Sequence, residues 1–279
     1  MLPLNLGIRA HDIHAHSREE LGEKLLANGF SHIQLAVQKS FPDAVPSLDS
    51  ISSGTGHFFG DYFARLGIKV SVLGCYVNLA SPDSMIRNQA IDHFKRHIAV
   101  ASSFQAAVVG TETGSVGNGY TTKNYTKEAY QTARQSIAEL VACAEKLGVI
   151  VGIEAGINHP LYTADLAKQL VQEIQSPNLR IIMDCANLMS VENHQQQKEV
   201  IHQALTNLRD DICSMHLKDF VVENGQIKIV PVGTGWMDYT QILKFLKYDK
   251  PLMFASLEAT AEEHLPNALS YLKELYDRV

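Results

Sequence analysis

The sequence lacks the features that mark membrane-spanning and disulfide-stabilised proteins. No stretch approaches the roughly 20 apolar residues needed to cross a bilayer, and the first residues show no basic region followed by an apolar one. The cysteines are far apart and form no C-x-x-C pair, which argues against a disulfide framework or a zinc knuckle. We therefore expect free thiols, a cytoplasmic location and no membrane partner.

Excess basic charge and nucleotide-binding motifs are also missing. The chain has 24 Lys and Arg against 30 Asp and Glu, a formal net charge of −6 and a pI near 6.0. Nucleic-acid binding usually requires a basic surface, so we expect no nucleic-acid partner. No G-x-G-x-x-G follows the first apolar run and no Walker sequence occurs, which argues against an open, doubly wound sheet.

The sequence does contain a regular alternation of apolar, strand-like runs with helical patterns, which indicates parallel strands joined by helices. The expected strands are Asn5–Arg9, His32–Val37, Lys69–Leu73, Ala106–Gly110, Val149–Ile153, Arg180–Met183, Ile212–Met215 and Leu252–Leu257. The expected helices are Ser17–Asn28, Gly60–Leu66, Ser84–Ala101, Lys127–Leu147, Ala164–Ile174, Gln195–Leu208, Tyr239–Leu246 and Pro266–Tyr276. A length of 279 residues with 46% hydrophobic residues fits one barrel. We predict an α/β fold, a single-domain (β/α)8 TIM barrel over residues 1–279.

One segment interrupts this alternation. Val221–Val230 places Asn-Gly between two β-branched runs, which is a strong signal for a β-hairpin. We expect a two-stranded excursion after the seventh strand, on the catalytic face of the barrel.

Four ligand-type residues come at the ends of consecutive apolar runs. These are Glu154 after V-I-V-G-I, Asp184 after R-I-I-M, His216 after I-C-S-M and Glu258 after M-F-A-S-L. Residues at the carboxyl ends of barrel strands converge at one face, where active sites of this fold lie. Three carboxylates and one imidazole suit one divalent metal ion, with Mn²⁺ favoured and Mg²⁺, Co²⁺ or Zn²⁺ as alternatives. Any one of them alone would be an ordinary strand-end residue, but four in succession favour a site.

These residues lie in motifs that resemble the xylose isomerase-like superfamily of sugar phosphate isomerases and epimerases. The motifs are G-I-E-A-G, I-M-D-C-A-N-L, S-M-H-L-K-D-F, P-V-G-T-G-W-M-D-Y and S-L-E-A-T. The resemblance implies that Glu154, Asp184, His216 and Glu258 bind the metal and that the two glutamates are the acid/base pair. The chain departs from ketose 3-epimerases at Asn187, where many relatives have histidine, and it has no clear counterpart of their arginine downstream of the strand-seven histidine.

The chemistry expected of such a site is proton transfer beside a carbonyl group. A metal that holds the carbonyl and hydroxyl oxygens stabilises the enediolate, and two carboxylates can remove and return the proton. We predict a divalent-metal-dependent isomerase or epimerase of a sugar, ketose or sugar phosphate, with Glu154 and Glu258 catalytic and a small-molecule carbohydrate as substrate. A keto-inositol-type dehydratase is the alternative. An endonuclease IV-like phosphodiesterase and a non-catalytic carbohydrate-binding barrel are further options, and a homo-oligomer is compatible with this sequence.

Five residues are candidates for binding substrate. Glu112 closes the fourth strand and either lines the pocket or orders its own loop. Lys218 either neutralises an enolate or phosphate or pairs with a rim carboxylate such as Asp219, and Asn187 is expected to orient a ligand or the substrate. The remaining two are His11, for which His14 is an alternative, and Trp236, which forms a wall for the sugar or packs against the rim. The amides of Gly233–Gly235 either hold an anion or form a plain turn.

Overall fold

The computed structural model describes residues 2–117 and 121–279, and eight parallel strands close into a barrel in the order β1-β10-β7-β6-β5-β4-β3-β2. Their bounds are β1 Leu6–Arg9, β2 His32–Leu35, β3 Lys69–Gly74, β4 Val108–Glu112, β5 Val151–Glu154, β6 Leu179–Asp184, β7 Ile212–Leu217 and β10 Phe254–Leu257. The predicted TIM barrel is therefore confirmed. Among the described residues, no helix is both long and apolar enough to cross a membrane.

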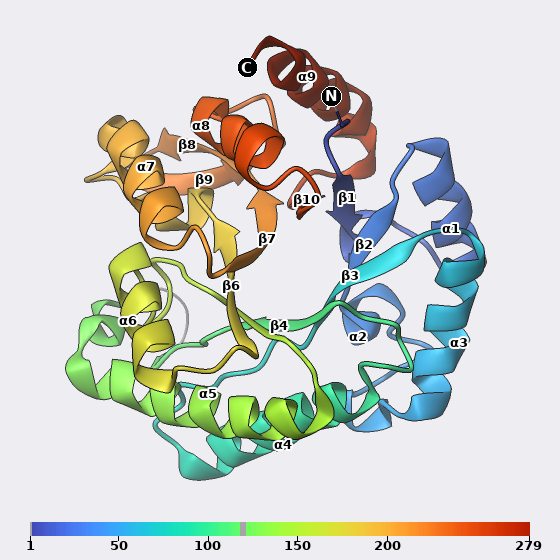
Figure 1. Cartoon of the computed structure of the whole chain (residues 1–279), viewed down its shortest axis with the longest axis vertical. Helices are drawn as coiled ribbons and strands as arrows, with labels where there is room; N and C mark the ends of the chain where they lie inside the picture. Colours follow the sequence, from blue (N-terminus) through green and yellow to red (C-terminus); the bar gives the residue numbers. More distant parts are fainter. Residues whose placement is uncertain (1, 118–120) are drawn as a thin grey trace.

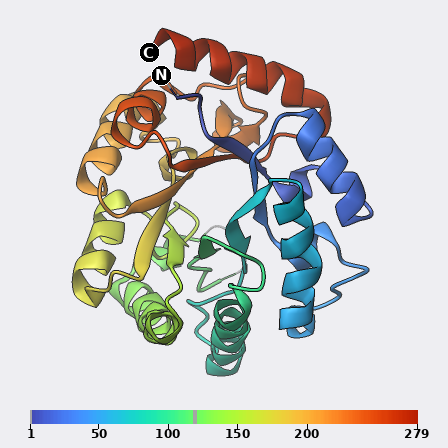
Figure 2. The same ribbon diagram turned by 45° about the vertical axis from the view of Figure 1, so that its right-hand side comes forward.

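The helices form a ring around the strands, with the two chain ends side by side near α9 (Figures 1 and 2). Their bounds are α1 Arg18–Ala27, α2 Val37–Ser40, α3 Ser53–Arg65, α4 Ser84–Val100, α5 Lys127–Leu147, α6 Ala164–Ile174, α7 Gln197–Asn207, α8 Thr240–Lys244 and α9 Leu265–Arg278. In α5, apolar residues spaced by three and four, such as Ile137 and Leu140, are fully buried against the strands. Gly148 ends this helix in the left-handed conformation, and its N–H donates to the Ala144 carbonyl.

Several expected bounds differ from the structure, and two of the differences have a clear local cause. The second strand ends at Leu35, not at Val37, because the chain turns there into the short helix α2. The third helix begins at Ser53, not near Gly60, because the Ser52 hydroxyl accepts the Thr55 N–H and caps it. The glycines of this helix obscured its pattern in the sequence. Close packing explains Gly60, because a Cβ there would lie 2.7 Å from the Ser103 carbonyl oxygen.

The barrel interior explains why the site lies at one end. Val72, Val108 and Ile182 form a small apolar cluster in the interior. Gly110 and Gly152 make room for it, because a Cβ on either would lie within 2.7 Å of one of these side chains. Strand side chains alternate between the two faces, so the inward residues beyond this cluster emerge at the carboxyl ends of the strands.

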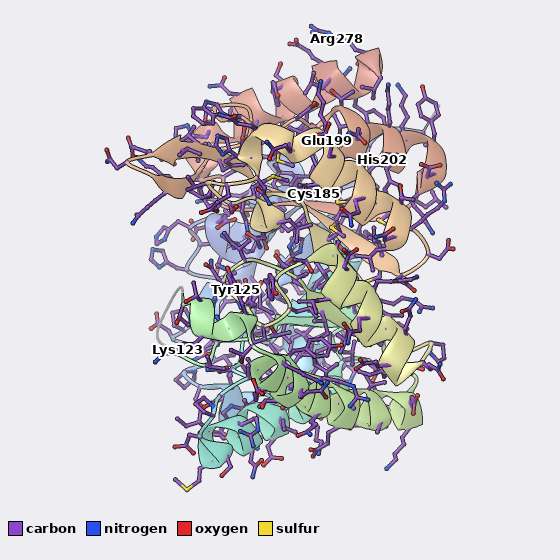
Figure 3. The ribbon with its side chains drawn as sticks, turned by 90° about the vertical axis from the view of Figure 1, so that its left-hand side faces the viewer. Lys123, Tyr125, Cys185, Glu199, His202 and Arg278 are labelled. Atoms are coloured by element: carbon purple, nitrogen blue, oxygen red, sulfur yellow. The ribbon has the colours of Figure 1, made fainter. Side chains whose placement is uncertain are left out.

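The predicted hairpin is present directly after β7. It consists of β8 Asp219–Glu223 and β9 Gln226–Val230, so it begins two residues earlier than expected. Asn224 and Gly225 form its turn with φ of 52° and 72°, as a two-residue turn of this type requires. The hairpin projects from the same side of the molecule as the rim residues Lys123 and Tyr125 (Figure 3).

Candidate active site

Four buried side chains meet at the carboxyl ends of neighbouring strands. Glu154 ends β5, Asp184 ends β6, His216 lies one residue before the end of β7, and Glu258 follows β10. Each is at most 3% exposed. One donor atom from each of Glu154, Asp184 and His216 lies within 4.8 Å of the others, which makes this group a potential metal-binding triad.

His216 is the centre of this cluster. Its Nδ1 atom lies 3.2 Å from Glu154 Oε2 and 3.4 Å from Glu258 Oε1, so the two glutamates flank one ring nitrogen. Within the described part of the chain, His216 Nε2 has no hydrogen-bond partner, and His216 Nδ1 meets only the two glutamates. Buried polar atoms normally have hydrogen-bond partners, so this imidazole among carboxylates fits a divalent cation.

Lys218 extends into the same cluster. Its ammonium nitrogen lies 2.9 Å from Asp184 Oδ2 and 3.0 Å from Glu258 Oε2, and it donates to Asn187 Oδ1 at 3.2 Å. Burial opposes the charged form, but these carboxylates outweigh it and raise the pKa of Lys218 well above its usual value. From the sequence, Lys218 was expected to pair with Asp219 or with another carboxylate at the rim. In the structure its partners are Asp184 and Glu258.

The two glutamates have different surroundings. Burial raises the pKa of Glu154, although the nearby His216 partly offsets this effect. Burial acts in the same direction on Glu258, but the charges of His216, Lys218 and Arg9 outweigh it and lower the pKa of that carboxyl. Different environments of this kind separate the roles of paired carboxylates in enzymes.

Asn187 holds Glu154 in place. Its side-chain amide donates to Glu154 Oε1, and its backbone N–H donates to Asp184 Oδ1 at 3.2 Å. Together with the bond from Lys218, these contacts connect β5, β6 and β7. The residue thus orients side chains of the cluster, as one of the sequence interpretations proposed.

Arg9 and Gln34 contact Glu258 and were not identified from the sequence. Gln34 donates to Glu258 Oε1 at 2.9 Å, and an Arg9 terminal nitrogen lies 3.3 Å from Glu258 Oε2. Two further Arg9 nitrogens donate to Asp12, whose carboxylate also accepts the Ala259 N–H at 2.8 Å. The available signal was their position: Arg9 ends β1 and Gln34 lies in β2, in strands that pair with each other.

Asp219 occupies the amides that the sequence suggested as an anion site. Its carboxylate accepts the backbone N–H groups of Gly233, Gly235, Met237 and Phe220 at 2.8–3.0 Å. A Cβ on Gly235 would lie 2.3 Å from Asp219 Oδ1, so only glycine fits there. The anion held by this turn is therefore a side chain of the protein itself.

Glu112 ends β4 beside Glu154, its register partner in the adjacent strand β5, and it has a partner that the sequence did not reveal. His159 Nε2 is 3.6 Å from Glu112 Oε2, and His159 Nδ1 donates to the Gly114 carbonyl at 2.9 Å. Burial opposes the charged form of His159, but Glu112 outweighs it and raises the pKa of the ring. Both residues, with Tyr76 and Asn78, line a cavity of about 350 Å³.

The other substrate-binding candidates lie at the rim. His11 is half-buried, and its ring meets Tyr76 edge to face with centroids 6.3 Å apart. His14 and His16 are bonded to each other at 3.2 Å in an exposed position. Trp236 is 51% exposed and stacks on His194, which rules out the alternative of burial against the rim, and its role as a wall for the sugar stays a prediction.

Comparison with known proteins agrees with this architecture. A family model described as xylose isomerase-like TIM barrel matches residues 23–275. No curated protein sequence matches the chain.

Several solved structures share the fold. A D-tagatose 3-epimerase-like protein has a TM-score of 0.77 and 19% identity, covering 100% of this chain and 98% of that one. The probable 3-DHS dehydratase AsbF from Bacillus anthracis has a TM-score of 0.75 and 16% identity, covering 98% and 99%. A xylose isomerase-like protein from Mycobacterium smegmatis in complex with magnesium has a TM-score of 0.68 and 17% identity, covering 100% and 97%. At these identities the likeness shows the fold alone.

Proposed function

The chain belongs to the xylose isomerase-like TIM barrel family, and on that basis we propose that it is a divalent-metal-dependent isomerase or epimerase of a carbohydrate. One observation carries the proposal: donor atoms of the buried Glu154, Asp184 and His216 lie within 4.8 Å of one another at the barrel mouth, and Glu258 Oε1 lies 3.4 Å from His216. Glu154, Asp184, His216 and Glu258 would hold the ion, with Mn²⁺ favoured. When bound, the ion supplies a Lewis acid that stabilises negative charge on substrate oxygens.

The two glutamates are the proposed proton-transfer pair. Their carboxylates lie 3.2 and 3.4 Å from His216 Nδ1, so a substrate held at this mouth would be within reach of both. Glu258 is fixed as an anion by Gln34, Arg9 and Lys218. Glu154 is contacted by an amide and the imidazole, and burial favours its protonated form. We assign Glu154 as the group that holds the transferred proton and Glu258 as the opposing base.

A dehydratase acting on a keto-polyol is the second candidate. It would use the same proton removal beside a carbonyl, followed by loss of a hydroxyl group. A structurally similar protein is named a probable 3-DHS dehydratase, and Glu112 with His159 lies beside Glu154, where the pair would supply a second proton donor.

Solvent deuterium incorporation tests both reactions. Metal-loaded protein would be incubated in D₂O with ketoses, ketose phosphates and keto-inositols, and the products analysed by NMR. Glu154→Gln and Glu258→Gln should each reduce turnover by about 10²–10⁴-fold while retaining metal. Glu199→Gln, on the outer helix α7 (Figure 3), is the matched control and should leave turnover unchanged.

The outcomes separate the mechanisms. Exchange kept in one glutamine variant and lost in the other supports a two-base reaction. Full activity in either metal-loaded variant would refute the paired role. Product formed without solvent deuterium would instead indicate a hydride shift between adjacent carbons.

A further inference from the structure

Lys39 is a cation without a carboxylate partner at the mouth of the barrel. It lies in α2, directly after β2, and its ammonium nitrogen lies 4.0 Å from the centre of the Tyr76 ring. Within the described residues, no carboxylate oxygen lies within 4.0 Å of this nitrogen and no hydrogen bond satisfies it. An ammonium group held over an aromatic ring and lacking an anion is available to a ligand.

Contacts made by Tyr76 connect Lys39 to the catalytic cluster. Gln34 donates to the Tyr76 hydroxyl and also to Glu258 Oε1, at 2.9 Å in the second case. Tyr76 also lines the 350 Å³ cavity that contains Glu112 and His159. Lys39 therefore contacts a ring that lines this cavity and that shares Gln34 with Glu258.

His11 provides a second unsatisfied group beside the same ring. Its Nδ1 atom is buried and has no hydrogen-bond partner within the described part of the chain. Burial, and then the positive charges of Arg9 and Lys39, lower the pKa of His11 to about 4. At neutral pH the ring is therefore uncharged and carries one N–H that can donate to a ligand.

The other cations near the mouth are already paired. Arg9 is bonded to Asp12 and contacts Glu258, and Lys218 lies between Asp184 and Glu258. Glu112, beside Glu154 in the adjacent strand, is paired with His159, and its charge acts on Lys39 only from beyond 4.0 Å. Among the described residues, the exposed Lys39 and the buried His11 Nδ1 thus have no acceptor in contact, and the carboxylates that act on Lys39 do so from beyond 4.0 Å.

We propose that Lys39 and His11 form an oxyanion subsite, so that the substrate carries a carboxylate or a phosphate at the end remote from the carboxylate–imidazole cluster. The inference rests on the proposed function, because it identifies the substrate class of that site. The cluster binds the reacting carbonyl end, and the subsite selects charged sugar derivatives over neutral ones. Charge-assisted hydrogen bonds are stronger than neutral ones, which provides this discrimination.

Binding of a matched set of ketoses tests the subsite. D-fructose, D-fructose 6-phosphate and D-fructuronate present a hydroxyl, a phosphate and a carboxylate at the same end of one carbon chain. Their dissociation constants would be measured calorimetrically on the full, Mn²⁺-loaded protein and on Lys39→Met, Lys39→Arg and His11→Phe. Lys69→Met is the matched control, since this exposed lysine lies at the start of β3, the opposite end of the barrel.

We expect the wild type to bind at least one of the anions more tightly than D-fructose. Lys39→Met should weaken that binding by about 10- to 100-fold and leave D-fructose unchanged. Lys39→Arg should retain most of the affinity, His11→Phe should weaken it less than Lys39→Met, and Lys69→Met should match the wild type. A preference for D-fructose 6-phosphate alone identifies a phosphate group, and one for D-fructuronate alone identifies a carboxylate.

Three results would overturn the inference: no binding of either anion, no effect of Lys39→Met on the bound anion, or an equal loss for D-fructose. The proposed function fails separately. Lys39-dependent anion binding without deuterium exchange in any substrate would sustain the subsite and refute the isomerase. Deuterium exchange into neutral ketoses that is unaffected by Lys39→Met, without tighter binding of either anion, would sustain the isomerase and refute the subsite.

Discussion

Asp219→Asn should destabilise the protein more than any exposed acidic substitution, although it changes only one atom of the side chain. Asp219 is 1% exposed, and each of its oxygens accepts two backbone N–H groups. Oδ1 accepts those of Phe220 and Met237, and Oδ2 accepts those of Gly233 and Gly235. An amide offers one oxygen, so one pair of N–H groups would face another donor.

The magnitude follows from the two lost acceptors. Each buried donor left unsatisfied costs about 1–3 kcal/mol, and bonds to a charged acceptor lie towards the upper part of that range. Partial relaxation of the turn would recover some of this loss. We expect the free energy of unfolding to fall by about 2–5 kcal/mol.

Trp236 makes this change observable, because it is the only tryptophan and lies in the turn that Asp219 holds. Its backbone N–H donates to the Phe220 carbonyl at 2.8 Å. In urea titrations of Asp219→Asn, tryptophan fluorescence should change before far-UV circular dichroism, since the turn loosens before the barrel unfolds. Asp165→Asn is the control: its exposed carboxylate accepts two side-chain amides, and its loss should cost less than about 1 kcal/mol. Coincident transitions and a loss below about 1 kcal/mol for Asp219→Asn would refute this reasoning.

Three further predictions concern the mouth of the barrel. Lys218→Met leaves buried carboxylates without their counter-charge, so it should lower the free energy of unfolding of the metal-free protein in urea by about 3–5 kcal/mol. Added Mn²⁺ should restore most of this stability, and an equal loss with and without Mn²⁺ would contradict the prediction. Asp12→Ala removes the acceptor of the Ala259 N–H, and adding Ala259→Gly should recover about 1 kcal/mol, because φ at residue 259 is +52°. Further destabilisation by glycine would show that this φ is unstrained. In an NMR titration, His159 should have a pKa above the usual value of about 6.5, because the charge of Glu112 outweighs the effect of burial. Glu112→Gln should lower this pKa. An unchanged pKa in the variant would show that Glu112 does not raise it.

Much of the site could be predicted from the sequence because strand periodicity is local. Glu154, Asp184 and His216 each follow an apolar run of inward and outward residues, so their convergence follows once the runs are read as parallel strands. The Asn-Gly signal located the hairpin within two residues for the same reason. Helix bounds were less accurate where glycine packs closely against a distant segment, as Gly60 does against residues 103 and 104.

The contacts that decide the chemistry could not be predicted in this way. Gln34 and Arg9 reach Glu258 across more than 200 residues of sequence, and His159 reaches Glu112 across a strand pair. A charged residue at a strand end carries no local sign of which charge it will face, because that depends on how the barrel closes and on the course of each loop.

The sequence by itself therefore determined the barrel, the hairpin and the order in which ligand-type residues reach one face. These depend on hydrophobic periodicity and turn chemistry, which act over a few residues. Only the tertiary structure decided that Arg9, Lys218 and His216 act together on Glu258, that Asp219 fills the glycine turn, and that no carboxylate of the described residues lies within 4.0 Å of Lys39. Electrostatic partners are chosen by distance in space, and barrel closure brings together side chains that are remote in sequence.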